Sequence, residues 1–96
     1  MRVLSKPIIL AFAELHPDAA PSLRAWYREA RRADWATFAE VRESFGSADR
    51  AGDLTVFNIA GNKYRLVAHI RHDWGKCFIR HIFTHAEYDE WNRGRR

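Results

Sequence analysis

The strongest constraint on the fold is a change in the spacing of apolar residues along the chain. Over residues 6–45 these residues recur at the spacing of amphipathic helices, and over residues 54–84 the period changes to that of half-buried strands. The chain has 96 residues, of which 47% are hydrophobic, and this is enough for one compact domain but too little for two. We therefore predict a single domain over residues 1–96.

Three helices are expected after a short strand-like start over residues 1–5. Ser5, Asp18 and Asp34 precede the three apolar stripes and are the expected N-caps. The stripes are Ile8, Ile9, Phe12 and Leu15, then Leu23, Trp26, Tyr27 and Ala30, then Trp35, Phe38, Ala39 and Val41. We expect them to form a core. The arginines of the second helix, at positions 24, 28, 31 and 32, are interpreted as a solvated face, with contact to a partner as the alternative.

The second half predicts an antiparallel sheet after a loop over residues 46–53. Its strands are Leu54–Ala60, Lys63–His72 and Cys77–Thr84, joined by a Gly61-Asn62 hairpin and a turn at residues 73–76. The predicted fold class is α+β, with N-terminal helices packed on one face of a small antiparallel sheet.

The hairpin register gathers basic residues on one face of the sheet. It pairs Asn58 with Arg65 and Val56 with Val67, and it places Lys63, Arg65, His69 and Arg71 on the face away from the helices. Pairing His72 with Cys77 across the second turn adds Arg80 to that face and turns Ile79, His81 and Phe83 inward. A slip of one residue would reverse this last assignment.

A basic sheet face favours an anionic ligand, although a solvated face is the alternative. Residues 49–96 contain nine basic and six acidic residues, and the whole chain has a net charge of +4. Like charges on neighbouring strands destabilise a sheet, so their clustering indicates a polyanion-binding surface.

A short C-terminal helix is predicted to begin where the last strand ends. Thr84 and Glu87 have the spacing of a capping box. His85 and Tyr88 then lie beside the basic face, and both are residue types that transfer protons. Packing of the helix is an equally good interpretation of Tyr88.

Metal, thiol and membrane chemistry are not expected. His69-x-x-His72 and His81-x-x-x-His85 have spacings found in zinc sites, but alternation separates His69 from His72 and His81. Cys77, the single cysteine, lacks an activating neighbour and predicts neither a nucleophile nor a disulfide. No apolar run approaches the length of a membrane span, and the first residues do not look like a secretory signal. We expect a cytoplasmic protein without a cofactor.

Two segments resemble a known protein family. Residues 56–68 read VFNIAGNKYRLVA and residues 84–89 read THAEYD, and together they resemble the HigB-type toxins of the RelE superfamily. The resemblance spans nearly the whole chain. It implies a RelE-like fold and a bacterial type II toxin that cuts mRNA in the decoding site of the translating ribosome without a metal. The implied partners are a HigA-type helix-turn-helix antitoxin, mRNA and the ribosome, with DNA contacted only through the antitoxin.

The resemblance also implies roles for individual residues. Arg65 matches the arginine that contacts the scissile phosphate, and His85 and Tyr88 match the proton-transfer groups. Lys63 and Arg80 match basic strand positions less closely and complete the catalytic candidates. The expected RNA-binding residues are Asn58, His69, Arg71 and Lys76.

The implied reaction is attack of a 2′-hydroxyl on the adjacent phosphate. His85 or Tyr88, with help from Lys63, would act as the base, and Arg65 and Arg80 would stabilise the phosphoryl oxygens. The need for a 2′-hydroxyl selects RNA over DNA. Two alternatives stay open: a non-catalytic RNA- or ribosome-binding module, and an inactive toxin that acts only in the repressor complex with its antitoxin.

Overall fold

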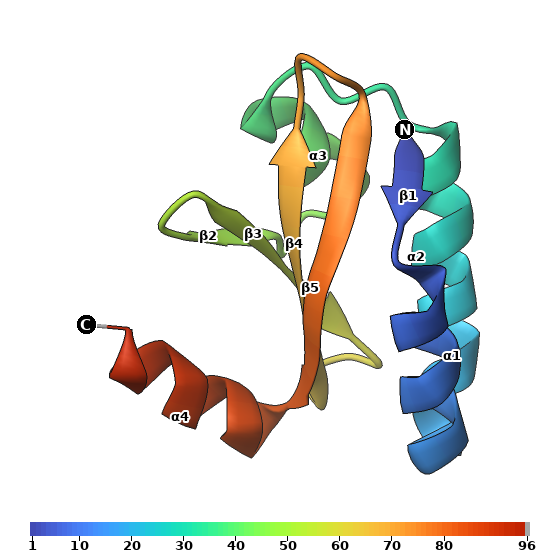
Figure 1. Cartoon of the computed structure of the whole chain (residues 1–96), viewed down its shortest axis with the longest axis vertical. Coiled ribbons are helices and arrows are strands. Elements are labelled where there is room, and N and C mark those ends of the chain that lie inside the picture. The colour runs from blue at the N-terminus through green and yellow to red at the C-terminus, as the bar shows by residue number, and fades with distance from the viewer. Residues whose placement is uncertain (96) are drawn as a thin grey trace.

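The computed structural model describes residues 1–95 and shows helices on both faces of one sheet (Figure 1). The elements are β1 (Arg2–Leu4), α1 (Lys6–Leu15), a 3₁₀ turn η1 (Pro17–Ala19), α2 (Ala20–Arg32), α3 (Phe38–Ser44), β2 (Asp49–Ala51), β3 (Leu54–Ile59), β4 (Tyr64–Arg71), β5 (Lys76–Thr84) and α4 (His85–Gly94). None of the helices within residues 1–95 has the length and apolar character needed to cross a membrane. The predicted α+β class, with N-terminal helices and a short C-terminal helix, is confirmed.

The sheet has two strands more than the three that we predicted after residue 46. Its order is β1-β5-β4-β3-β2, so the strand-like start joins the sheet at one edge. β1 runs parallel to β5 because α1, α2 and the rest of the chain separate them, whereas the other pairs are antiparallel. The expectation of a purely antiparallel sheet is wrong because β1 is parallel to β5. The expected loop over residues 46–53 is wrong in part, because β2 lies within it and pairs with β3.

The main core lies between the sheet and the first three helices. Trp26 of α2, Trp35 and Phe45 surround Phe57 of β3, with ring centroids between 5.3 and 6.1 Å from that of Phe57. A second, smaller apolar cluster lies on the opposite face, where α4 covers part of the sheet (Figure 1). The sheet therefore separates the N-terminal helices from α4.

The ends of the helices agree only partly with the expected caps. α1 ends at Leu15, before His16-Pro17, as predicted. Ser5 precedes α1 with a φ of 73° but makes no side-chain cap, and Thr37 rather than Asp34 caps α3. The capping box of α4 is confirmed, because Thr84 and Glu87 exchange both hydrogen bonds.

The β3–β4 hairpin has the predicted register. Asn58 pairs with Arg65 and Val56 with Val67. The connection is longer than the two residues expected, since the strands end at Ile59 and restart at Tyr64. Ala60 begins this turn in the left-handed region, with a φ of 54°. This conformation is unfavourable for alanine because its Cβ crowds the carbonyl oxygen.

Replacing Ala60 with glycine is expected to stabilise the protein by about 0.5–1 kcal/mol, because glycine adopts this φ without the steric cost. Thermal unfolding would show a midpoint higher by a few degrees. The matched control is Ala11→Gly inside α1, which we expect to destabilise by about 1 kcal/mol. A lower midpoint for Ala60→Gly would show that the turn is not strained at this position.

The predicted β4–β5 register is wrong because Cys77 pairs with Ile70 rather than with His72, and because β5 contains a bulge. Arg71 pairs with Lys76 and Arg65 with Phe83, and the register shifts between Val67 and Ala68. Arg80 has no partner in this ladder, since Val67 pairs with His81 and Ala68 pairs with Ile79. The extra residue reverses the alternation, so Ile82 is buried and His81 is exposed. His81 and Phe83 therefore lie on the face away from α1 and α2, contrary to the prediction.

Candidate active site

The candidate site lies on the sheet face that carries α4, here called the α4 face. This face consists of the side chains of β3, β4 and β5 that point away from α1 and α2. Tyr88 and Trp91 hold α4 on it by packing against Val56, Val67 and their apolar neighbours. Arg95 extends this contact, with its guanidinium 4.6 Å from the centre of the Trp91 ring. α4 is thereby fixed beside the basic strand residues.

Arg65 is the most constrained basic residue of the α4 face. Its side chain is only 9% exposed. Its Nη1 donates to the carbonyl oxygens of Asn62 and Tyr64, at 3.2 and 3.1 Å, and its Nη2 donates to Asn62 Oδ1 at 2.6 Å. A guanidinium has five N–H donors, so two stay without a partner among residues 1–95. The turn that contains Asn62 thus fixes the orientation of Arg65 and leaves donors for an oxyanion.

Tyr88 lies against Arg65. The guanidinium carbon of Arg65 is 5.8 Å from the centre of the Tyr88 ring, a cation–π distance. Burial and the Asp49 carboxylate raise the pKa of the Tyr88 phenol, and Arg65 offsets part of this effect. The phenol is therefore protonated at neutral pH, which suits a proton donor better than a base.

His85 forms a pair with Asp89 in the first turns of α4. Its Nδ1 is 3.1 Å from Asp89 Oδ2, one helical turn further along the chain. In a neutral His85 ring, donation from Nδ1–H to the carboxylate leaves Nε2 as the nitrogen without a proton. Both side chains are about half exposed. The arrangement presents an oriented imidazole nitrogen to solvent, as a general base requires.

Lys63 lies apart from Arg65, toward the N-terminal helices. Its Nζ is 3.5 Å from Asp18 Oδ2, and Tyr64 donates its hydroxyl to Asp18 at 2.8 Å. Asp18, predicted as a helix cap, instead links η1 to the start of β4. The Tyr64 hydroxyl and Lys63 hold the pKa of the Asp18 carboxyl below its ordinary value of 3.8. The prediction that Lys63 lies on the basic face is therefore wrong.

Asp18→Asn is expected to lower stability most above pH 4–5. Because the folded-state pKa of Asp18 is lowered, its contribution is complete above the unfolded pKa and is lost as the pH falls through the folded pKa. Thermal unfolding of both proteins from pH 2 to 7 would show a gap in midpoint that closes toward low pH. Lys63→Ala is the control, with a small effect because this ion pair is exposed. A gap independent of pH would rule out the ionised carboxylate as the cause.

The bulge places Arg80 and His81 together on the exposed part of β5. The His81 ring stacks on Phe83 with centroids 4.9 Å apart and lies 5.5 Å from Trp91. Partial burial and the charge of Arg80 lower the pKa of His81, which favours a neutral imidazole. Arg80 itself makes no salt bridge within residues 1–95. The aromatic surface of His81, Phe83 and Trp91 thus adjoins Tyr88, and Arg80 precedes His81 on β5.

The other predicted RNA-binding residues are spread along the strands. Asn58 pairs with Arg65 at one end of β4. His69 lies near Phe78, and Arg71 and Lys76 lie at the far end, where they flank the 58% exposed Trp74. Arg71 lies six positions after Arg65, about 20 Å along a strand. The predicted RNA-binding residues therefore form an extended row along the α4 face rather than a single pocket. This row is called the track below.

Sequence reasoning missed three aromatic residues of this track. His81 was assigned to the core because nothing in the sequence marks the bulge. Trp91 follows the THAEYD segment and belongs to the stripe of α4, so its spacing from Tyr88 was a usable signal. Trp74 was read only as part of a turn, although Arg71 and Lys76 flank it in the sequence.

The cysteine and histidine residues form no alternative centre. Cys77 is fully buried, and burial raises the pKa of its thiol to about 12. Among residues 1–95, no three His, Cys, Asp or Glu side chains gather closely enough to hold a metal ion. His72 lies elsewhere, with its Nδ1 2.8 Å from the carbonyl oxygen of Trp35.

Comparison with known families identifies the chain. Residues 19–91 match the model of the HigB toxin family, described as the RelE-like toxic component of a toxin–antitoxin system. The chain belongs to the HigB toxin family. The match includes α2, α3, all of β2–β5 and most of α4, so the predicted resemblance to HigB-type toxins is confirmed.

Named relatives of the HigB family agree with this assignment. The mRNA interferase HigB of Escherichia coli O6:H1 is 31% identical over 96 residues, covering 97% of this chain and 93% of the relative. The mRNA interferase toxin HigB of Escherichia coli K12 is 50% identical over 34 residues, covering 35% of this chain and 33% of that protein. The expectation that the chain belongs to a family of toxins whose named members are mRNA interferases is confirmed.

Proposed function

We propose that residues 1–96 form one toxin domain that cleaves mRNA on translating ribosomes without a metal. The observation that carries this proposal is the group of three side chains where β4 meets α4. Arg65 is fixed over the Tyr88 ring, and His85, three residues before Tyr88 on α4, is oriented by Asp89. These groups match the requirements for moving a proton and stabilising a phosphoryl oxygen.

The proposed reaction is an in-line attack by a ribose 2′-oxygen on the adjacent phosphorus. His85 Nε2 accepts the 2′ proton, and the P–O5′ bond breaks as the 2′-O–P bond forms. Tyr88 gives its proton to the leaving 5′-oxygen, since its raised pKa keeps the phenol protonated. Arg65 and Arg80 stabilise the charge on the non-bridging oxygens. The products are a 2′,3′-cyclic phosphate and a 5′-hydroxyl.

The track along the α4 face is proposed to bind the message on either side of the cleaved bond. Arg80, His69, Arg71 and Lys76 supply cationic or hydrogen-bonding groups, and Trp74 and His81 supply surfaces for base stacking. Asn58 is proposed to contact RNA beside Arg65. Lys63 has the weakest support as a catalytic group, because its ammonium faces Asp18.

Family membership supports further parts of the proposal. A toxic component of a toxin–antitoxin system implies an antitoxin partner. We propose a helix-turn-helix antitoxin of the HigA type, through which alone the complex would touch DNA. The proposed location is the cytoplasm, where translating ribosomes are found.

The proposal is tested by mapping RNA ends on a defined message in a reconstituted bacterial translation system. We expect new ends within codons, carrying a cyclic phosphate and a 5′-hydroxyl, only when ribosomes translate and equally when EDTA-treated protein is added. His85→Gln is expected to slow cleavage by about 10²–10⁴-fold, and Asp89→Asn by less, because Asp89 only orients the imidazole.

The matched control is Glu90→Gln, which removes an exposed carboxylate from α4 without touching the His85–Asp89 pair. Ribosome binding without new ends would contradict the enzyme and favour the non-catalytic binding module. Cleavage by folded His85→Gln at the original rate would remove this residue from the reaction.

A further inference from the structure

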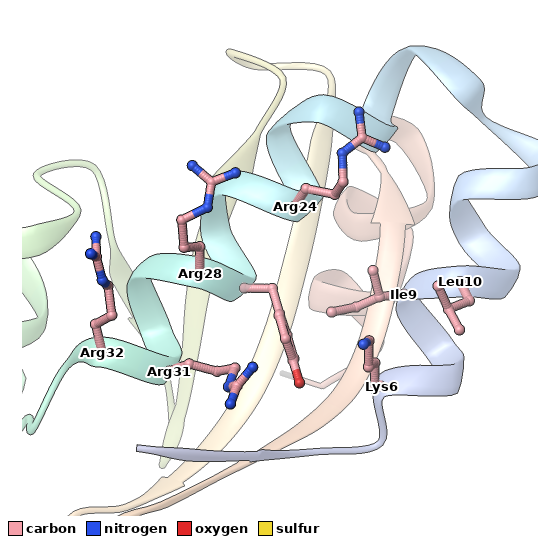
Figure 2. A pocket seen from close by; sticks show the side chains of 8 residues that line it. Lys6, Ile9, Leu10, Arg24, Arg28, Arg31 and Arg32 are labelled. Carbon is pink, nitrogen blue, oxygen red and sulfur yellow. The ribbon is translucent and has the colours of Figure 1, made fainter.

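A hollow lies far from the α4 face, between α1 and α2. Its volume is about 640 Å³, and eight residues line it: Lys6, Ile9 and Leu10 from α1, and Arg24, Tyr27, Arg28, Arg31 and Arg32 from α2. Figure 2 shows the arginines spaced along α2, with Lys6, Ile9 and Leu10 across from them on α1. This hollow is here called the α1–α2 groove, and the two helices that form it lie on the opposite side of the sheet from α4 (Figure 1).

The rim of the α1–α2 groove carries positive charge without a counter-charge. Five of its eight lining residues are cationic and none is acidic. Arg24, Arg28 and Arg32 follow one another at four-residue intervals, which places like charges side by side on a helix and destabilises it. No salt bridge within residues 1–95 involves any of these cations. A bound anionic partner would remove this repulsion.

The floor of the groove is apolar, and this property distinguishes the partner's chemistry. Leu10 is 59% exposed at the groove, and the partly exposed Tyr27 and the largely buried Ile9 also line it. Lys6 and Arg31 lie over the Tyr27 ring, at 5.0 and 5.6 Å from its centre. RNA gains little from aliphatic side chains, whereas an amphipathic helix uses them as anchor sites. The apolar floor therefore favours a protein helix over nucleic acid.

The dimensions also fit a helix. Arg24 and Arg32 are eight residues apart on α2, about 12 Å along the axis, which is a little over two turns. A third helix lying between α1 and α2 would place apolar residues at three- and four-residue spacing on Leu10 and the partly exposed Tyr27. Glu or Asp residues flanking that stripe would reach the cations on both sides.

We propose that the α1–α2 groove binds an acidic amphipathic helix of a partner protein. The surface is separate from the residues assigned to RNA cleavage, so the proposal does not depend on that reaction. The sequence left open two interpretations of the four arginines of α2, a solvated face and a contact with a partner. We adopt the contact with a partner.

The test uses a synthetic fluorescein-labelled helix of about 16 residues, with Leu at three- and four-residue spacing and Glu on both flanks. We expect the full-length protein to bind it, with chemical-shift changes confined to α1 and α2. Two control peptides, one with Leu replaced by Ser and one with Glu replaced by Gln, are expected to bind at least about tenfold more weakly.

Two protein variants with the same change in net charge test whether the peptide binds at the α1–α2 groove. The double variant R24E/R28E, on the groove, is expected to weaken peptide binding on the order of tenfold or more, whereas R42E/R93E, outside it, leaves binding within about twofold. L10S is expected to weaken binding without changing net charge. All variants change exposed side chains, and circular dichroism checks their folding.

Equal binding by R24E/R28E and R42E/R93E would overturn the proposal. Failure of the Leu/Glu peptide to bind would overturn it as well. Tight binding of single-stranded RNA that R24E/R28E abolishes and the peptide does not compete would assign the groove to nucleic acid instead.

Discussion

Replacing Arg65 with alanine is expected to reduce the rate of RNA cleavage by about 10²–10³-fold, the loss typical of one preorganised oxyanion donor. The guanidinium is fixed by Asn62 and the Tyr64 carbonyl and is stacked near Tyr88, so it meets the phosphate without reorganising. The measurement is the rate of appearance of new 5′ ends on a translated message, at a protein concentration that saturates the ribosomes.

Two controls separate chemistry from folding for Arg65. Asn62→Ala removes one bond from the Arg65 guanidinium and is expected to cost less activity than Arg65→Ala, since the cation stays. Arg65→Lys keeps the charge but not the planar fork and should rescue activity only in part. Undiminished cleavage by a folded Arg65→Ala protein would contradict the proposed contact of Arg65 with the scissile phosphate.

Phe57→Ala is expected to destabilise the fold by about 3–5 kcal/mol, a large part of the 5–15 kcal/mol that holds a typical domain together. Phe57 is 1% exposed, and its ring is packed among Trp26, Trp35 and Phe45. Truncation leaves a cavity between the sheet and the helices that these rigid rings fill poorly. Urea unfolding followed by tryptophan fluorescence measures the loss.

The control for Phe57 is Phe78→Ala, which removes the same ring from a half-buried position near His69. It is expected to cost well below the loss at Phe57, because solvent already reaches that side chain. Similar losses at the two positions would show that the aromatic cluster around Phe57 is not the centre of the core.

Local signals accounted for much of the fold. The change of apolar period predicted the helical half and the three long strands, since each pattern reports which side of an element is buried. The Gly61-Asn62 turn predicted the pairing of Asn58 with Arg65, and Thr84 with Glu87 predicted the start of α4. Each of these signals acts between residues close in the chain.

Long-range features were not accessible in the same way. The strand-like start agrees with β1, but its parallel pairing with β5 was not predicted. β2 has only three residues, too few for a reliable period, and it pairs with the edge of β3. The bulge at Arg80 depends on how β5 fits both β4 and α4. One extra residue there moved His81 from the expected core to the exposed face.

The candidate site likewise has features that the local sequence predicts and features that depend on long-range packing. The sequence by itself determined which residue types could do the chemistry: the VFNIAGNKYRLVA and THAEYD segments indicated the family, and they offered Arg65, His85 and Tyr88 as the candidate catalytic residues. Only the tertiary structure decided how these side chains are used. The contact with Asp18 turns Lys63 toward the N-terminal helices, the packing of α4 brings Tyr88 against Arg65, and the packing of α1 beside α2 adds Lys6 to the arginines of the α1–α2 groove, because side-chain direction follows from packing that local spacing does not encode.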